Sequence, residues 1–206
     1  MLLSVDNLSV SRGGISLFEG LNFTVSSGQF VSINGGNGVG KTSLLRSIAG
    51  LQPIDKGKIV VHADNFIFSG DANGIKSTLT VLENLRFWSS IFGGKNLHQA
   101  LEKFQLKQLT NRFAGKLSAG QKRRLSLARL LLIDRPIWLL DEPTVSLDKK
   151  SMEEFSKIVK NHLEAGGAAV VATHIDLGLT LSSLNINLED YKMKNGNINA
   201  SAKAFL

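Results

Sequence analysis

Residues 33–46 read INGGNGVGKTSLLR, and most of what the sequence says about architecture starts from them. Gly35–Thr42 matches the pattern G-x-x-x-x-G-K-[ST] at every fixed position. A β-prone run, Phe30–Ile33, precedes the glycines, and apolar residues at helical spacing follow them. Glycines let backbone N–H groups turn toward phosphate oxygens without obstruction by a Cβ. The stretch therefore predicts a phosphate-binding loop between a strand and a helix.

The chemistry of such a loop assigns roles to its last residues. A helix that begins near Lys41 directs the positive end of its dipole at the phosphates. Lys41 is expected to reach the β- and γ-phosphates, and the Thr42 hydroxyl to bind Mg²⁺. The candidate nucleotide-binding residues of this stretch are Gly35, Gly36, Asn37, Gly38, Val39, Gly40, Lys41, Thr42 and Ser43.

A second half of the site is predicted where an apolar run, residues 136–140, ends in two acids. Ligands of α/β folds bind at the carboxyl ends of buried strands. Asp141 is expected to hold Mg²⁺, directly or through water. Glu142 is expected to orient and deprotonate the attacking water. The predicted cofactor is thus Mg²⁺ with a nucleoside triphosphate, which the family resemblance described below implies to be ATP.

A single histidine, His174, follows the apolar run Ala168–Ala172. A lone histidine is more often structural than catalytic. Because it stands at a strand terminus beside the predicted site, a catalytic role near the γ-phosphate is favoured.

The sequence LSAGQ, residues 117–121, opens a predicted helix and suggests a second anion site. A helix N-terminus offers free N–H groups and a positive dipole. The residues expected to contact phosphate here are Ser118, Ala119, Gly120 and Gln121. They belong to a part of the chain away from its own phosphate loop, so a second copy is needed to supply them. The alternative, an ordinary helix cap with Ser118 as N-cap, stays open.

The order of predicted strands and helices indicates one α/β domain with a parallel sheet. Its core is expected to span residues 1–70 and 126–206, with a helical lobe inserted at about 71–125. Strands are expected over residues 2–33 as short runs, and at Lys58–Val61, Phe66–Phe68, Ile137–Leu140, Ala168–Ala172 and Leu184–Leu188. Helices are expected at Leu97–Leu106, Ala119–Leu132 and Met152–Ala165, and an apolar stripe over Leu82, Leu85, either Trp88 or Ser89, and Phe92.

Composition narrows the function classes. The chain has 206 residues, 43% of them hydrophobic, a net charge of +7 and no cysteine. Its apolar runs are far shorter than the ~20 residues of a spanning helix. The basic charge fits either a solvated surface or a position beside nucleotide and an anionic membrane leaflet. With no zinc-finger, helix-turn-helix or aromatic-basic stacking pattern, no nucleic-acid partner is expected.

Together these motifs resemble the ATP-binding-cassette family over essentially the whole chain. Gly35–Thr42 is similar to its Walker A motif, Leu117–Gln121 to its signature, Ile137–Glu142 to Walker B, Ser146–Asp148 to the D-loop and His174 to the switch histidine. The resemblance implies a P-loop core with a mixed, largely parallel sheet, an N-terminal antiparallel β portion and an inserted helical subdomain. It also implies ATP hydrolysis, a head-to-tail dimer with a second copy, a D-loop role for Asp148, and integral membrane permease subunits docked on the helical lobe.

A narrower resemblance is to the CcmA-type ATPases of cytochrome c maturation, the ATP-binding subunits of a haem exporter. Similar segments include residues 37–46, Ile48–Leu51, Leu79–Phe87 and Leu117–Arg129, with Ala119 at the third signature position. This resemblance implies a peripheral location on the cytoplasmic face of the bacterial inner membrane. The alternatives are the ATPase of another small-molecule transporter and a non-transport cassette acting on nucleic acid or ribosomes.

Two positions depart from the general family pattern. Where an aromatic residue usually stacks on adenine, the chain offers Arg12, whose guanidinium can stack on a base, with Phe18 as the other candidate. Where a glutamine usually senses the metal, Ser69-Gly70-Asp71 stands instead. Asp71 is therefore a further candidate metal ligand, and a simple turn is the alternative.

Overall fold

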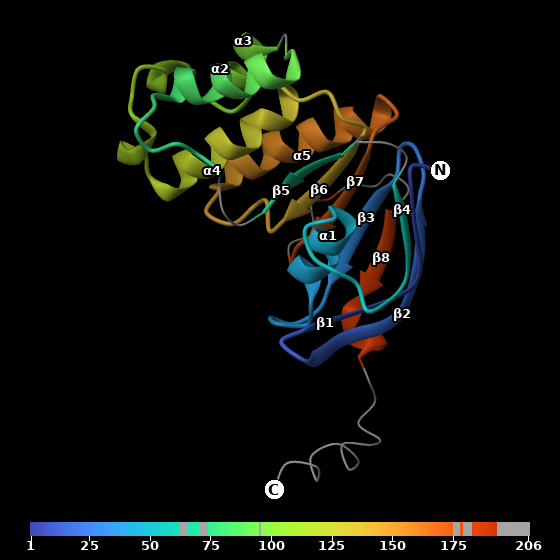
Figure 1. The fold of residues 1–206 in the computed structure, drawn as a ribbon. Helices are drawn as coiled ribbons and strands as arrows, with labels where there is room; N and C mark the ends of the chain where they lie inside the picture. Colours follow the sequence, from blue (N-terminus) through green and yellow to red (C-terminus); the bar gives the residue numbers. More distant parts are fainter. Residues whose placement is uncertain (62–65, 71–73, 95, 175–177, 179–182, 193–206) are drawn as a thin grey trace, which may run out of the picture.

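The computed structural model describes residues 1–61, 66–70, 74–94, 96–174, 178 and 183–192 (Figure 1). Two sheets and a group of helices make up this part of the chain. The helices of the helical lobe lie beyond one side of the larger sheet, and the smaller sheet lies on its other side.

The larger sheet has five parallel strands in the order β5-β6-β7-β3-β8. Their bounds are β3 Phe30–Asn34, β5 Phe66–Ser69, β6 Ile137–Asp141, β7 Ala168–Ala172 and β8 Ser183–Asn187. β3 carries the phosphate loop and lies between β7 and β8, and β8 is the edge strand on that side of the sheet. The carboxyl ends of β3 and β6 therefore meet at one edge of the sheet.

The smaller sheet is antiparallel, in the order β2-β1-β4. It is formed by β1 Leu3–Arg12, β2 Ile15–Val25 and β4 Lys56–Val61. β1 and β2 are long strands rather than the short runs expected, and their pairing is interrupted by register shifts. Asn7, with a φ of 46°, and Gly20, with a φ of 69°, lie at these shifts. Bulges of this kind let a long hairpin bend around the core.

The helices divide between the two faces of the parallel sheet. Their bounds are α1 Lys41–Ile48, α2 Val81–Phe92, α3 Leu97–Lys103, α4 Ala119–Ala128 and α5 Lys149–Glu164, with short 3₁₀ turns η1 Lys107–Leu109, η2 Ala114–Lys116, η3 Arg129–Leu131 and η4 Leu188–Tyr191. α1 packs with the antiparallel sheet against one face, and α2 to α5 cover the other.

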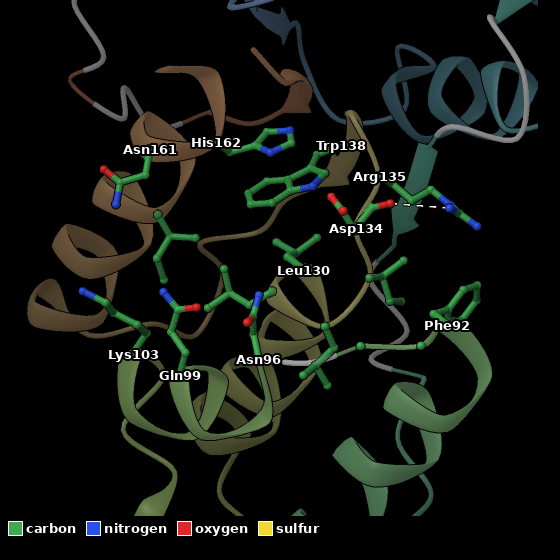
Figure 2. A pocket seen from close by; sticks show the side chains of 16 residues that line it. Phe92, Asn96, Gln99, Lys103, Leu130, Asp134, Arg135, Trp138, Asn161 and His162 are labelled. Carbon is green, nitrogen blue, oxygen red and sulfur yellow. Dashed lines mark hydrogen bonds between the residues drawn. The ribbon is translucent and has the colours of Figure 1, made fainter. Parts of the chain in front are cut away.

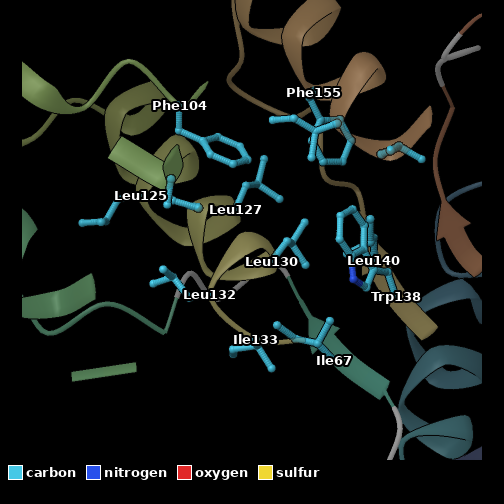
Figure 3. Close-up of a cluster of buried hydrophobic side chains, with 14 of the residues drawn as sticks. Ile67, Phe104, Leu125, Leu127, Leu130, Leu132, Ile133, Trp138, Leu140 and Phe155 are labelled. Atoms are coloured by element: carbon cyan, nitrogen blue, oxygen red, sulfur yellow. The ribbon is translucent and has the colours of Figure 1, made fainter. Parts of the chain in front are cut away.

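Alternate residues of β6 belong to two separate hydrophobic clusters. Trp138 and Leu140 join the cluster under the helical lobe and α5, whereas Ile137 and Leu139 join the cluster around α1. Figure 3 shows part of the first cluster, in which Phe155 of α5, Leu130 of η3 and Ile67 of β5 lie around Trp138 and Leu140. Both faces of the strand are buried, which is why it reads as a continuous apolar run rather than an alternating one.

Several expected boundaries are wrong. α3 ends at Lys103 rather than Leu106, because Gln105 adopts a left-handed φ of 54°. α4 ends at Ala128 rather than Leu132 and continues only as a 3₁₀ turn. α5 begins at Lys149, earlier than Met152, because Asp148 caps it.

The apolar stripe expected on α2 is only partly right. Leu85 is fully buried, while Phe92 is 39% exposed. Val81 and Asn84, outside the expected stripe, are buried instead. The Asn84 side chain bonds the carbonyls of neighbouring turn residues, so a polar residue occupies a position on the buried side of this helix.

Candidate functional site

The phosphate loop holds the Lys41 side chain folded back over its own backbone. The Lys41 ammonium donates to the carbonyl oxygens of Gly35 (2.8 Å) and Gly36 (3.3 Å). The residue is 7% exposed. Gly40 precedes it with a φ of 114°, and a Cβ there would lie 3.1 Å from Leu17. Only glycine fits this left-handed, crowded position without strain.

Thr42 and Asp141 come together from the two predicted halves of the site. The Thr42 hydroxyl donates to the Asp141 carboxylate at 2.8 Å, and Asp141 is 3% exposed. Among the described residues there is no group of three or more histidines, cysteines and acids that could hold a metal alone. Mg²⁺ in nucleotide sites takes one or two protein oxygens, phosphate oxygens and waters, so this pair of hard oxygen ligands fits it.

Glu142 and His174 lie beside the Lys41 ammonium. The Glu142 carboxylate is 4.0 Å from Lys41 Nζ and 3.4 Å from His174 Nε2. Lys41 Nζ is 2.9 Å from His174 Nε2. The imidazole nitrogen that contacts the ammonium is also the one that faces the Glu142 carboxylate. Three residues from three segments of the chain therefore converge on one point.

A hollow of about 300 Å³ is lined by residues of the phosphate loop and of the end of β6, among them Lys41, Thr42, Asp141 and Glu142, together with Arg12 and Leu17. Arg12 is exposed at its rim, which leaves it available to a base. Phe18 does not fit the alternative, because its side chain is 0% exposed and packs in the core. Its candidacy for adenine stacking is therefore wrong. Asp71, the candidate metal ligand, lies outside the described residues.

The signature residues do not line this hollow, although all of them are described. Ser118 caps α4 in a capping box: its hydroxyl accepts from the Gln121 N–H at 3.3 Å, and the Gln121 side chain accepts from the Ser118 N–H at 3.0 Å. The helix-cap interpretation is thus confirmed. It does not compete with phosphate binding, because an accepting hydroxyl keeps its proton for donation.

The signature lies against the D-loop. A Cβ at Gly120 would be 2.7 Å from the carbonyl oxygen of Ser146, so the two segments approach too closely for any other residue. Asp148 caps α5 by accepting from the Ser151 N–H at 2.8 Å, and this bond lowers the pKa of the carboxyl below its ordinary value. Ala119 is exposed on the first turn of α4.

Two residues that the sequence did not single out contact the site. Glu189 in η4 accepts from the Gly36 N–H at 3.0 Å and pairs with Lys192 at 2.7 Å. Hydrogen bonds from Lys192 and then from Gly36 lower its pKa. Arg123 in α4 donates to carbonyls at the end of β6. An acid in a terminal turn and an arginine in a basic run carry no local sign of these contacts.

A larger groove of about 570 Å³ lies between the helical lobe and the core (Figure 2). Gln99 and Lys103 of α3 border one side of it and Asn161 and His162 of α5 another. Trp138 and His162 stack at 3.8 Å between ring centroids. Trp138 is the second residue of β6, which ends at Asp141, so the groove abuts the opposite end of that strand.

A phosphate loop between strand and helix, with Thr42 bonded to the acid that ends a parallel strand, defines a P-loop nucleoside triphosphatase. The chain belongs to the ABC transporter family, whose model matches residues 18–145. It is 52% identical to the cytochrome c biogenesis ATP-binding export protein CcmA of Ruegeria pomeroyi over 90% of this chain and 91% of that protein. It is 54% identical to the protein of the same name from Paracoccus denitrificans, over 86% and 85%.

Solved structures agree on the fold. A putative ABC transporter ATP-binding protein from Pyrococcus furiosus superimposes with a TM-score of 0.80 at 27% identity, covering 93% of this chain and 99% of that one. A dimeric ATP-binding cassette in a post-hydrolysis state bound to ADP and Pi gives a TM-score of 0.75 at 26% identity, covering 84% and 88%.

These findings confirm the ATP-binding-cassette and CcmA-type resemblances, and with them the α/β fold expected from the sequence. The chain is an ATPase of the ABC family and binds ATP. No helix in the described ranges is both long enough and apolar enough to cross a bilayer.

Proposed function

We propose that this chain is the ATP-hydrolysing subunit of a membrane complex for cytochrome c biogenesis, of the haem-export type. Identity of 52% over about nine-tenths of both chains to a cytochrome c biogenesis ATP-binding export protein carries this proposal. The proposal also divides the chain into a core, residues 1–70 and 126–206, and a helical lobe of about 71–125.

In the proposed reaction, water attacks the γ-phosphate in line. Glu142 takes the proton from that water, and His174 and Lys41 stabilise charge on the transferred group. The convergence of these three side chains within 4.0 Å supports the roles. Thr42 and Asp141 would hold Mg²⁺, which neutralises phosphate charge when bound. The loop amides and Lys41 supply most of the positioning.

A second copy completes the site in this proposal. Ser118 and Gly120 of one copy would donate to the γ-phosphate held by the other, in a head-to-tail pair. Support comes from the position of the signature outside its own hollow and from the similar cassette solved as a dimer with ADP and Pi. Asp148 would lie at the contact between the two copies.

Integral membrane permease subunits are the proposed partners on the helical lobe, at the cytoplasmic face of the bacterial inner membrane. The groove beside α3 supports this assignment, since it is large enough for the side chains of a docked segment. Phe92 and Ile91, 39% and 55% exposed, stand at the end of α2 and would extend the same contact. Docking there would reach the site through β6, because Trp138 and Asp141 lie about 10 Å apart on that strand.

The test is complementation in a Paracoccus denitrificans strain that lacks its own CcmA. Wild-type chain should restore haem-stained c-type cytochromes, whereas Glu142→Gln should not. The purified variant should bind ATP normally and hydrolyse it about 100- to 10 000-fold more slowly, the range for losing a general base.

The complementation assay and the hydrolysis assay test different parts of the proposal. Full ATPase activity without restored cytochromes would overturn the biogenesis role and leave the cassette assignment intact. Unimpaired turnover by Glu142→Gln would remove Glu142 from the role of general base.

A further inference from the structure

Arg123 lies on the second turn of α4 and is only 5% exposed. Its guanidinium reaches from α4 to the end of β6. Nη2 donates to the carbonyl oxygens of Asp141 at 2.8 Å and Glu142 at 2.7 Å, and Nε donates to that of Pro143 at 3.0 Å. One side chain thus binds three successive carbonyls at the end of β6.

A fourth bond extends the contact to the neighbouring strand. Arg123 Nη1 donates to the carbonyl oxygen of Gly70 at 3.0 Å, directly after β5. Guanidinium has five N–H donors in a fixed planar fork, and no other side chain can serve four diverging carbonyls at once. The residue type therefore matches the arrangement it binds.

Of the three successive residues whose carbonyls Arg123 binds at the end of β6, the middle one, Glu142, has an unfavourable backbone conformation. Glu142 has a φ of 44°, in the left-handed region that non-glycine residues rarely adopt. Such conformations persist where surrounding bonds over-determine them. The Glu142 N–H donates to Ala172 at 2.8 Å and its carbonyl accepts from Arg123, so both sides of the residue are fixed.

This backbone conformation sets the direction of the Glu142 carboxylate, which lies 4.0 Å from Lys41 Nζ and 3.4 Å from His174 Nε2. Arg123 itself is absent from the residues that line the nucleotide hollow. Its influence on the reaction therefore passes through the residues whose carbonyls it binds, and Glu142 is one of them.

We propose that Arg123 is a positioning residue that holds Glu142 in its left-handed conformation from the signature helix. The proposal rests on the proposed role of Glu142 as general base. Ser118 begins the same helix five residues earlier in the sequence, so a shift of α4 relative to the core changes both the phosphate-binding signature and the aim of the base. Seating of the signature and activation of water are thereby linked within each copy.

The test compares Arg123→Met with Arg129→Met. Arg129 is also a buried arginine, but it donates to Ser126 within its own segment, and its guanidinium lies over the Trp88 ring. Both variants should lower Tm. Arg123→Met alone should lower kcat, by about 10- to 100-fold, the effect of misplacing a catalytic group by roughly 1 Å. Its ATP Kd and KM should stay within about twofold of wild type, because the phosphate loop is untouched.

A double variant decides between positioning and general damage. On a Glu142→Gln background, measured by single turnover, Arg123→Met should add little further loss, because the group it positions is gone. A full additional loss there would overturn the positioning role while leaving Glu142 as the base. So would an equal fall in kcat for Arg129→Met. If Glu142→Gln alone kept full turnover, the general-base assignment would fail instead.

Arg123→Lys provides the same test should Arg123→Met not fold. Lysine keeps the charge but cannot span four carbonyls. The kcat of Arg123→Lys should therefore lie between those of wild type and Arg123→Met, and its ATP Kd should not change. Wild-type kcat in Arg123→Lys would overturn the proposal.

Discussion

The helices α1 and α4 both begin at a predicted phosphate contact, yet their first turns are built differently. α1 begins after Gly40, and no side chain of the described residues caps it. α4 begins with a complete capping box between Ser118 and Gln121. An uncapped N-terminus leaves backbone donors without protein partners, which suits it to a phosphate. A capped N-terminus already has partners for its first backbone donors, so it is stable before a ligand held by another molecule binds to it.

The difference assigns separate tasks to the two ends. The first turn of α1 lies inside the hollow with Lys41 and Thr42, where the nucleotide itself can complete the helix. The first turn of α4 stands on the helical lobe with an exposed Ser118. Removing the signature hydroxyl should therefore lower the rate of ATP hydrolysis, whereas distorting the start of α1 should weaken ATP binding.

Ser118→Ala should have the largest effect. Loss of one preorganised donor should lower kcat by about 100- to 1000-fold, and loss of the cap should lower the unfolding free energy by about 1 kcal/mol. ATP affinity of the isolated chain should not change. Ser118→Asp separates the two causes, since aspartate restores the cap without a hydroxyl donor. Recovery of turnover in Ser118→Asp would show that the hydroxyl matters only as a cap.

Gly40→Ala should come next. A Cβ at a φ of 114° and 3.1 Å from Leu17 and Phe18 introduces strain, expected to be about 1–3 kcal/mol. Movement of the phosphate loop to relieve this strain should weaken ATP binding by about tenfold for each 1.4 kcal/mol of binding free energy that is lost. Gly50→Ala is the matched control, because it also has a positive φ, 69°, but nothing within 4 Å. Titration with a fluorescent ATP analogue measures both, and equal affinities would contradict the steric argument.

Thr80→Ala should have the smallest effect on the reaction. Thr80 and Glu83 form the same kind of capping box at α2 as Ser118 and Gln121 form at α4. Its loss should also lower the unfolding free energy by about 1 kcal/mol, but turnover per folded molecule should equal that of wild type. A large fall in kcat for Thr80→Ala would mean that cap loss alone explains the Ser118 variant.

The parts of the site that the sequence predicted are local in the chain. Gly35–Thr42 and Asp141–Glu142 each follow a strand, so a pattern read along the sequence was enough to place them. Strand alternation predicted less well. In β2, Leu21 and Phe23 face the core, and Phe18 would point outward if the alternation continued. The register shift before Leu21 reverses it, which buries Phe18 and leaves Arg12 beside the hollow.

The long-range contacts of Arg123 could not be predicted from the sequence. Arg123 sits between Lys122 and Arg124, and such a run normally indicates a solvated helix face. Only the packing of α4 against the end of β6 turns one of the three inward. Burial lowers the pKa of the second inward-facing arginine, Arg129, to about 10, with a smaller contribution from Arg123. The burial of Arg123 and Arg129 depends on tertiary packing, which the charge pattern of the sequence does not indicate.

The bond between Glu189 and Gly36 has a consequence for how the protein is made. β3, which carries the phosphate loop, pairs only with β7 and β8. Both are synthesised more than 130 residues after it, and the carboxylate that fixes Gly36 comes later still. A growing chain therefore cannot finish this loop while it emerges from the ribosome. Nucleotide meets a completed pocket only after nearly the whole domain has been translated.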